Sequence, residues 1–410
     1  MPKLQERTRR HGRSGAAAGA PAIAGVALAV TIARSGTARA DVLPDDRADL
    51  FYSRYSGGGM EITGESVAAR KKFSENFAVD YSYFVDKVSG ASVDVLSNAS
   101  VIKDERKQNS ITTTFVHDKT TYALSYTNSK ERDYISNTPH VSLSQDMFGD
   151  LTTVTLGFGR SRDAVGENNG TAFKPIIAWL GHAESRSYEV GLSQILTRNW
   201  IASVTAEVIT DDGYLANPYR SIRYFDPTSA KGYSLGSQVY PDTRTSTAVE
   251  ARTKYYLPYR ASVGLSYRYF RDTWGIAGNT TELDYTQPIA NVWIFEGRVR
   301  YYSQGHANFF SDIFPYANSQ NFEGRDKDLA ASKNLTIGAK ATYAFLPEGW
   351  KMFKRGTASL DLSEIRFKYG DFRDIKDFND TPAGGSYPAG GEPLYRFNAF
   401  IVQGYLSMFF

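Results

Sequence analysis

The sequence has 410 residues, with 47 Lys and Arg against 44 Asp and Glu, 41% hydrophobic residues and no cysteine. Disulfide staples and thiol chemistry are therefore excluded. A mean hydropathy of −0.39, with no uninterrupted apolar run of about eighteen residues, excludes a helical membrane protein.

The first forty residues have the organisation of a cleavable export signal. Basic residues between Lys3 and Arg13 precede an apolar stretch from Ala16 to Ala33. Ala38 and Ala40 then match the small-x-small cleavage rule. The pattern predicts a signal peptide over 1–40 and a mature chain that begins at Asp41.

The first forty residues have two alternative interpretations. They could direct twin-arginine export through Arg9-Arg10, or they could be a retained membrane anchor. The leader holds seven of the 47 basic residues and one of the 44 acidic residues, so residues 41–410 carry a net charge of about −3. The basic balance of the whole chain therefore belongs to the leader. The mature part has no electrostatic footprint for nucleic acid.

After the leader, polar and apolar side chains alternate, which is the period of a β-strand. Tyr and Phe, at 27 and 24 residues, suit sheets and interfacial aromatic girdles. Sixteen strands are predicted at residues 48–56, 60–72, 77–88, 109–117, 119–128, 134–145, 151–161, 185–196, 200–210, 244–257, 260–271, 279–287, 292–303, 333–345, 357–370 and 394–410.

The connections between these segments are alternately short and long. Tight turns such as 74–76 and 117–119 alternate with long polar and aromatic connections at 89–108, 162–184, 211–243, 304–332 and 371–393. Outer-membrane barrels have short periplasmic turns and long outer loops. The pattern predicts an all-β fold, a single antiparallel transmembrane β-barrel over 41–410 with about 16 strands. Fourteen is the alternative, because segment 48–56 is short and is joined to the next by three glycines.

The clearest alternation lies in 244–257, where Val249 and Ala251 share one face and charged side chains share the other. An outer-membrane barrel turns its polar parity toward an aqueous interior. The predicted pore-lining residues are Glu250, Arg252, Lys254, Arg268, Glu282, Asp284, Glu296, Arg298 and Arg300. An interior filled by salt-bridged side chains is the alternative to a channel. Sixteen strands favour the channel.

The connection 304–332 is long, aromatic and acidic. One interpretation folds it into the lumen as a constriction, with acidic residues facing the basic strands: Asp312, Glu323, Asp326 and Asp328. The favoured alternative is a surface loop that is packed on its neighbours by Phe309, Phe310 and Phe314. Asp326 and Asp328 could suggest calcium, but the spacing of a dedicated calcium loop is missing, so no metal site is predicted.

Two features mark the end of the chain. In 357–370, Leu360 and Leu362 share one parity whereas Ile365 and Phe367 share the other, which predicts a β-bulge near Ser363-Glu364. The last strand ends in an alternating row that closes on an aromatic and resembles the signal read by the barrel-insertion machinery. That row consists of Leu406, Met408 and Phe410.

Signals for catalysis are weak. No metal-binding His-Glu-x-x-His helix, nucleophile elbow or phosphate-binding glycine loop occurs. Barrel hydrolases place catalytic side chains on strands near the outer rim, so His140 with Ser142 and Ser144 is the candidate catalytic set. A polar-face histidine is more often a solvated wall residue. The chain is predicted not to be an enzyme and to bind no cofactor.

Several long blocks resemble an uncharacterised Gram-negative outer-membrane family, the domain-of-unknown-function family thirty-five-seventy. They are RADLFYSRYSGGGMEI, RKKF, SQDMFGDLTTVTLGFGRS, NPYRSIRY, YPDTRT, KYYLPYRASVGLSYRYFRDTWGI and EPLYRF, and the resemblance runs from about residue 45 to Phe410. It implies an outer-membrane β-barrel in a Gram-negative bacterium and supplies no catalytic residues. Members of the family occur beside genes for periplasmic flavin-transfer and thioredoxin-like proteins.

Three functions follow as hypotheses. The first is porin-like passage of small polar or charged solutes. The second is a structural or partner-binding barrel associated with a periplasmic redox system, and the third is a barrel hydrolase. The expected partners are outer-membrane lipids, the barrel-insertion machinery, a small polar solute and a periplasmic protein, but not nucleic acid.

Overall fold

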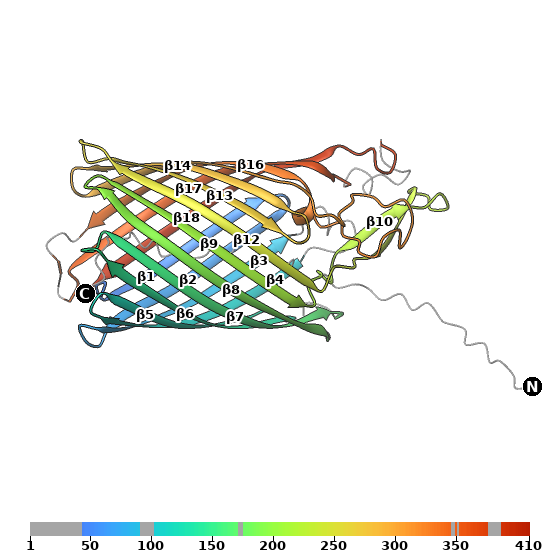
Figure 1. Ribbon diagram of the computed structural model, residues 1–410. Coiled ribbons are helices and arrows are strands. Elements are labelled where there is room, and N and C mark those ends of the chain that lie inside the picture. The colour runs from blue at the N-terminus through green and yellow to red at the C-terminus, as the bar shows by residue number, and fades with distance from the viewer. Residues whose placement is uncertain (1–42, 91–101, 171–174, 346–348, 351, 376–386) are drawn as a thin grey trace, which may run out of the picture.

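A computed structural model describes residues 43–90, 102–170, 175–345, 349–350, 352–375 and 387–410. Sixteen strands form one closed antiparallel barrel in the order β1-β18-β17-β16-β15-β14-β13-β12-β9-β8-β7-β6-β5-β4-β3-β2 (Figure 1). Strands β10 and β11 form a separate hairpin. Within the described residues, no helix has the length and apolar character needed to span a membrane.

The barrel strands are β1 (Arg47–Gly57), β2 (Met60–Lys72), β3 (Phe77–Gly90), β4 (Ile102–His117), β5 (Thr120–Lys130), β6 (Tyr134–Met147), β7 (Thr152–Asn168), β8 (Ile177–Thr197), β9 (Trp200–Gly213), β12 (Thr243–Tyr256), β13 (Ser262–Asp272), β14 (Ala277–Ile289), β15 (Trp293–Gln304), β16 (Ser332–Phe345), β17 (Arg355–Arg373) and β18 (Leu394–Phe409). The hairpin consists of β10 (Ser221–Phe225) and β11 (Tyr233–Ser237), and a short 3-10 helix, η1, spans Lys327–Leu329.

The apolar parity of each strand forms the outer surface of the cylinder. Leu265, Leu283, Val299 and Ile337 lie in one cross-strand row on β13–β16. Each of these four side chains is about half exposed, although all are large and apolar. A continuous apolar exterior is what a barrel presents to lipid acyl chains.

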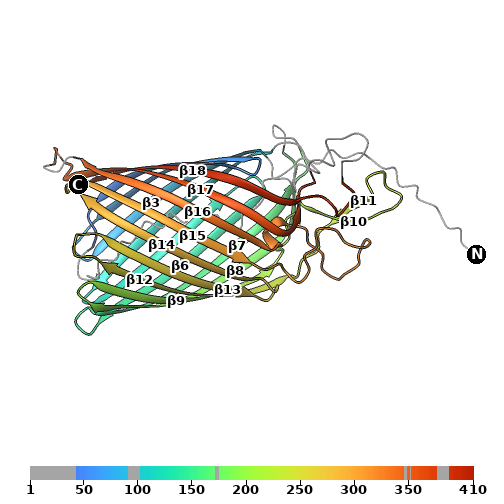
Figure 2. The same cartoon turned by 90° about the horizontal axis from the view of Figure 1, so that it is seen from above.

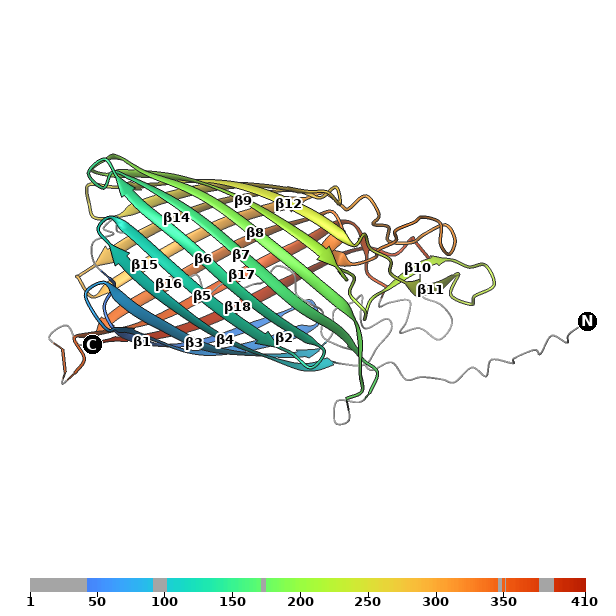
Figure 3. The same cartoon turned by 60° about the horizontal axis from the view of Figure 1, so that its bottom comes forward.

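The two ends of the cylinder differ. The C terminus and short turns lie at one end, and the β10–β11 hairpin extends beyond the other (Figures 1 and 2). The hairpin end also carries the connection 305–331 and residues 387–393 (Figure 3). By the rule for bacterial barrels, the short-turn end is periplasmic and the hairpin end is extracellular.

The predicted sixteen-stranded barrel is confirmed, and the alternative of fourteen strands is wrong. The segment predicted at 48–56 is β1, which pairs with both β18 and β2 and so closes the cylinder. A two-residue turn joins β1 to β2 through Gly58 and Gly59, whose φ angles of 60° and 82° favour glycine. The hairpin β10–β11 was not predicted.

The predicted β-bulge near Ser363-Glu364 is wrong. The pairing of β17 with β18 is regular from Arg355 to Lys368, and the register shifts only between Lys368 and Arg373. Glu364 and Arg366 therefore lie on the outer parity, where they form a 2.9 Å ion pair. Toward the extracellular end of β17 the outer face is therefore polar, and the apolar side chains of Ile365 and Phe367 lie on the inner face.

The described ends of the chain meet at the periplasmic rim. The backbone N–H of Phe410 donates to the carbonyl of Asp46 at 3.0 Å. Leu406 and Met408 lie on the outer parity of β18, opposite Leu50 and Ala48 of β1. Their role as an insertion signal stays a prediction, and so does leader cleavage at Ala38, Ala40 and Asp41, which lie outside the described residues.

Candidate functional site in the barrel lumen

All the predicted pore-lining residues lie on one face of β12–β15. In one cross-strand row, Arg252 is opposite Ser266, which is followed by Glu282 on β14 and Arg300 on β15. The same face carries Glu250 and Arg268, which are paired with each other, and also Lys254, Asp284, Arg298 and Glu296.

This face is the inside of the cylinder, because its ion pairs reach over an intervening strand. Arg298 of β15 contacts Asp361 of β17 at 2.9 Å across β16, and Lys254 of β12 approaches Asp284 of β14 to 3.7 Å across β13. Side chains converge in this way only on the concave side of a sheet. Gly264 on the intervening β13 leaves room for the Asp284 carboxylate, with which an added Cβ would collide.

Gly338 has the same function beneath Arg298. The Arg298 guanidinium donates to both carboxylate oxygens of Asp361 at 2.9 Å and to the hydroxyl of Ser363 at 2.7 Å. A Cβ at Gly338 would lie 2.8 Å from Nε of Arg298 and 2.6 Å from Oγ of Ser363. The glycine therefore permits the guanidinium to lie flat along the wall.

We predict that Gly338→Ala displaces Arg298 and lowers the free energy of unfolding by about 1.5–3 kcal/mol, the range for hydrogen bonds to charged groups. The measurement is urea unfolding of the refolded barrel in lipid vesicles, followed by tryptophan fluorescence. Gly297→Ala is the matched control, because an added Cβ there meets nothing within 4 Å. Equal midpoints for the two variants would contradict the assignment.

Water reaches the charged wall. The side chains of Arg252 and Lys254 are 61% and 53% exposed although they point inward, and that of Arg268 is 39% exposed. An interior packed with side chains would bury them. Along β12–β14 the lumen therefore contains solvent-accessible space.

Small hydroxyl side chains line the far wall, on β4–β7. Their parity is opposite to that of Leu124 and Val141, which are exposed on the outer face. They hydrogen-bond to one another along the wall at about 3 Å, as in the pairs Ser110–Thr127 and Ser144–Thr155. The lumen is thus densely charged along β12–β15, whereas the β4–β7 wall is rich in hydroxyl groups and carries fewer charges, such as Arg106 in its ion pair with Asp86.

His140 is part of this hydroxyl wall. Its ring lies along the two glycines of β7, since a Cβ at Gly157 would be 3.4 Å from Nε2 and one at Gly159 would be 3.2 Å from Cδ2. Ser142 lies beside it on the same face, and the Ser144 hydroxyl is bonded to β7 at 3.0 Å. Packing against the wall accounts for this geometry, and a catalytic role stays an untested hypothesis.

A third sector of the lumen is aromatic, and the sequence analysis did not identify it. Phe51 of β1 lies 4.8 Å from Tyr405 of β18 and 6.4 Å from Phe84 of β3, measured between ring centroids. Both phenylalanines are buried. This side of the interior, between β18 and β3, is therefore narrowed by rings, whereas the β12–β14 side is open.

At the extracellular end, three connections are joined by a buried ionic network. Arg223 of β10 donates to both carboxylate oxygens of Glu392 at 2.5 and 3.0 Å, and also to the carboxylate of Asp312. Arg325 donates to the same aspartate at 2.9 Å. Arg223 is fully buried, and its two acidic partners lie 89 and 169 residues away in the chain. We call this set, Arg223, Asp312, Arg325 and Glu392, the loop network.

The loop network corrects one interpretation of connection 304–332. Asp312 and Asp326 pair with arginines of the loops, not with the basic strands of the wall. The favoured alternative is confirmed: Phe314 is fully buried, and Phe309 and Phe310 pack in a cluster with Trp274 and Tyr240.

Tyr219 and Arg220, in the connection between β9 and β12, contact segments on both sides of the extracellular end of the barrel. The Tyr219 hydroxyl donates to Asp133, in the turn between β5 and β6, and accepts from the Asn168 backbone at 2.7 Å. The next residue, Arg220, is buried against Asp326, before η1. Burial and the bond to Asp133 raise the pKa of the Tyr219 hydroxyl, so it stays a donor at physiological pH.

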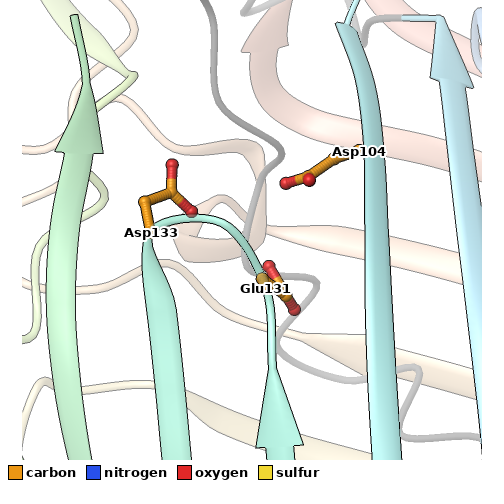
Figure 4. Close-up of side chains that lie close together, drawn as sticks. All are labelled: Asp104, Glu131 and Asp133. Atoms are coloured by element: carbon orange, nitrogen blue, oxygen red, sulfur yellow. The ribbon is translucent and has the colours of Figure 1, made fainter. Parts of the chain in front are cut away.

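Asp133, the partner of Tyr219, belongs to a carboxylate cluster (Figure 4) that the sequence analysis did not find. Carboxylate oxygens of Asp104, Glu131 and Asp133 lie within 4.8 Å of one another. Asp104 also accepts from Arg132 at 3.3 Å, and Asp133 from Tyr219. Burial, together with the nearby Asp104 charge, raises the pKa of Glu131 to about 7. The set has the donors for a divalent cation, but two of its members already have protein partners.

Comparison with known proteins identifies a family. The family model described as "Protein of unknown function (DUF3570)" matches residues 97–355, a shorter span than the resemblance from residue 45 to Phe410. No curated protein matches the chain. Among solved structures, a loop-deletion mutant of OmpT, an outer-membrane protein of Vibrio cholerae, is 8% identical, with 88% of this chain and 98% of that chain covered and a TM-score of 0.40.

OccK2 (OpdF) of Pseudomonas aeruginosa is 11% identical, with 89% of this chain and 99% of that chain covered and a TM-score of 0.39. At such low identities no residue role is carried over from these proteins.

Proposed function

This chain belongs to the DUF3570 family of proteins of unknown function, and we propose that its barrel passes small polar or charged solutes across the outer membrane of a Gram-negative bacterium. The observation that carries the proposal is the high exposure of inward-pointing Arg252 and Lys254. Water at these side chains needs a luminal space, which a sixteen-stranded barrel is wide enough to provide.

The charge pattern of the wall supports passage of polar solutes. Charged residues of both signs line β12–β15, and hydroxyl groups line β4–β7. Charges on one side of a narrow aqueous space create a transverse field, which orients dipolar solutes and weights the passage of cations and anions. A solute with charged and hydroxyl groups would find partners on both walls.

The test is conductance of the refolded chain in planar lipid bilayers. We expect discrete steps in current whose size is proportional to the applied voltage. The conductance of each step should rise with salt concentration, as in an aqueous pore, and no added factor should block it. A correctly folded barrel, identified by heat-modifiable electrophoretic mobility, that inserts and remains electrically silent would overturn the proposal.

The second candidate is a structural or partner-binding barrel that belongs to a periplasmic redox system. The aromatic sector of Phe51, Phe84 and Tyr405 favours it, since this side of the interior is narrowed by packed rings. Copurification of one periplasmic protein with the barrel from native membranes would support this candidate. Catalysis by His140 with Ser142 or Ser144 is not part of either proposal.

Glu131 gives the proposed channel a pH dependence. Its pKa of about 7 means that the carboxyl group is mostly neutral below pH 7 and mostly charged above it. Raising the pH from about 6 to about 8, roughly one pH unit either side of that pKa, therefore adds most of one negative charge at the extracellular rim, beside Asp104 and Asp133. We expect cation selectivity, measured from reversal potentials in a salt gradient, to increase over that window.

The matched variant for this prediction is Glu131→Gln, which keeps the shape and removes the titration. The cation selectivity of this variant should not change between about pH 6 and about pH 8, the window around the pKa of about 7 that Glu131 has in the parent chain. Asp150→Asn, in a periplasmic turn, is the control and should keep the pH response of the parent chain. A response that survives in Glu131→Gln would assign the titration to another group.

A further inference from the structure

The outer surface of β3–β6 changes character in steps toward the extracellular end. Below, the outward residues are apolar, such as Leu124 and Val141. Above them a row of tyrosines and amides is hydrogen-bonded: Tyr81 donates to Asn109 at 2.8 Å, and Tyr126 donates to Asn137 at 2.8 Å. Tyrosines with one apolar and one hydrated end mark the level of lipid headgroups.

Lysines follow directly above this row on the same outward parity. Lys107 of β4 comes two residues after Glu105 and two before Asn109, and it is paired across the strands with Lys130 of β5. Lys87 of β3 is paired with Glu105. The Lys107 side chain is 55% exposed, and Lys130 is exposed as well. We call Lys87, Lys107 and Lys130 the lysine patch.

Negative charge is uneven across the lysine patch. Glu61 and Glu65 flank Thr63, the β2 partner of Lys87, whereas within the described strands the Lys130 side has no such pair of carboxylates. Glu105 forms a 2.8 Å ion pair with Lys107, and in the part of the chain that the structure describes no ion pair joins Lys130 to a carboxylate. Directly opposed like charges destabilise an antiparallel pair, since their Cβ atoms are only about 5 Å apart. An anion between Lys107 and Lys130 would remove this repulsion.

A second basic pair on the outer face shows the contrasting arrangement. Arg160 of β7 is paired across the strands with Arg186 of β8, just above the ring pair of Phe158 and Tyr188. Here Glu184 bridges both guanidinium groups at 2.5 Å. Glu184 thus neutralises both members of this pair, whereas Glu105 contacts Lys107 and forms no ion pair with Lys130 in the described part of the chain.

We propose that the lysine patch is a binding site for the phosphate groups of lipid headgroups in the outer leaflet. The ligand is lipid-borne because the patch lies on the lipid-facing parity, directly above the tyrosine–amide row and the apolar surface that contacts acyl chains. A phosphorylated lipid on this surface places its chains along Leu124 and Val141 and its phosphate between the ammonium groups. The site does not depend on whether the lumen conducts.

The experiment measures lipid retention by native mass spectrometry. The refolded chain in detergent is incubated with lipid A, which carries two phosphates, or with its dephosphorylated form, and the bound fraction is measured. The variants are Lys107→Gln/Lys130→Gln and, as the matched control, Lys71→Gln. Lys71 is 57% exposed and also pairs with a carboxylate, but it lies near the periplasmic end of β2.

We expect lipid A to bind the parent chain and the control equally, and the double variant at least about tenfold more weakly, as two lost charges near an anionic surface imply. The dephosphorylated lipid should bind all three alike. Equal retention of lipid A by the double variant would overturn the proposal. Displacement of lipid A by equimolar inorganic phosphate would overturn it as well, since the patch would then be a site for free phosphate.

Discussion

Replacing Arg223 by methionine is expected to open the extracellular loop network while leaving the barrel closed. Arg223 is fully buried and is the link between β10, Asp312 and Glu392. Its loss leaves two carboxylates buried with fewer partners, which costs about 3–5 kcal/mol. Hydrogen–deuterium exchange of peptides from 305–331 should then approach that of an unfolded segment, while exchange in β12–β15 stays unchanged.

The matched control is Arg366→Met. Arg366 also makes two hydrogen bonds to a glutamate, Glu364, but its side chain is 55% exposed on the outer face. An exposed pair contributes about 0–1 kcal/mol, so exchange should change little. A second variant, Arg223→Met with Glu392→Gln, removes one orphaned charge and should recover part of the protection. Parent-like exchange in Arg223→Met would show that the network does not hold the loops.

Neutralising the luminal arginines is expected to have the largest effect on ion passage. Arg252, Arg268 and Arg300 supply positive charge to the open side of the lumen. Their joint replacement by glutamine leaves an excess of carboxylates on the same wall. Cation-over-anion permeability should rise by about three- to sevenfold, because a change of about half to one kT in luminal potential favours cations and disfavours anions by the same factor.

This permeability ratio is measured from the reversal potential in a tenfold salt gradient. For monovalent ions, a perfectly selective pore would give a reversal potential of about 59 mV. Glutamine in place of Arg366 is the control, because this arginine lies outside the cylinder. Its selectivity should equal that of the parent chain. An unchanged ratio in the triple variant would place the conducting path away from β12–β15.

The barrel wall could be predicted from the sequence because each strand carries its own evidence. Alternation in 244–257 and 260–271 set the polar and apolar faces before any contact was known, and the observed pairing aligns Glu250 with Arg268 on the predicted face. Short turns fixed neighbouring strands as antiparallel pairs. The local alternation of side chains, together with the need for the sheet to close on itself, was sufficient to predict the barrel wall.

The extracellular loops could not be predicted in this way, because their order depends on contacts between distant segments. Strands β10 and β11 have five residues each and are stabilised by Arg223, whose partners are far away in the chain. The β17 error has a related cause. The predicted β-bulge would have brought Ile365 and Phe367 onto the face of Leu360 and Leu362, but at that height the apolar environment is inside, where Phe367 stacks on Phe397 at 4.5 Å.

The central claim is that the charged parity faces an open aqueous lumen and the apolar parity faces lipid. The chain has no cysteine, so single cysteines at adjacent positions of β13 can be labelled without background. Ser266→Cys tests the luminal parity and Leu265→Cys the outer parity. In lipid vesicles, a charged, membrane-impermeant thiol reagent should label position 266 rapidly and leave 265 unmodified. Rapid labelling of 265 with no labelling of 266 would contradict the account.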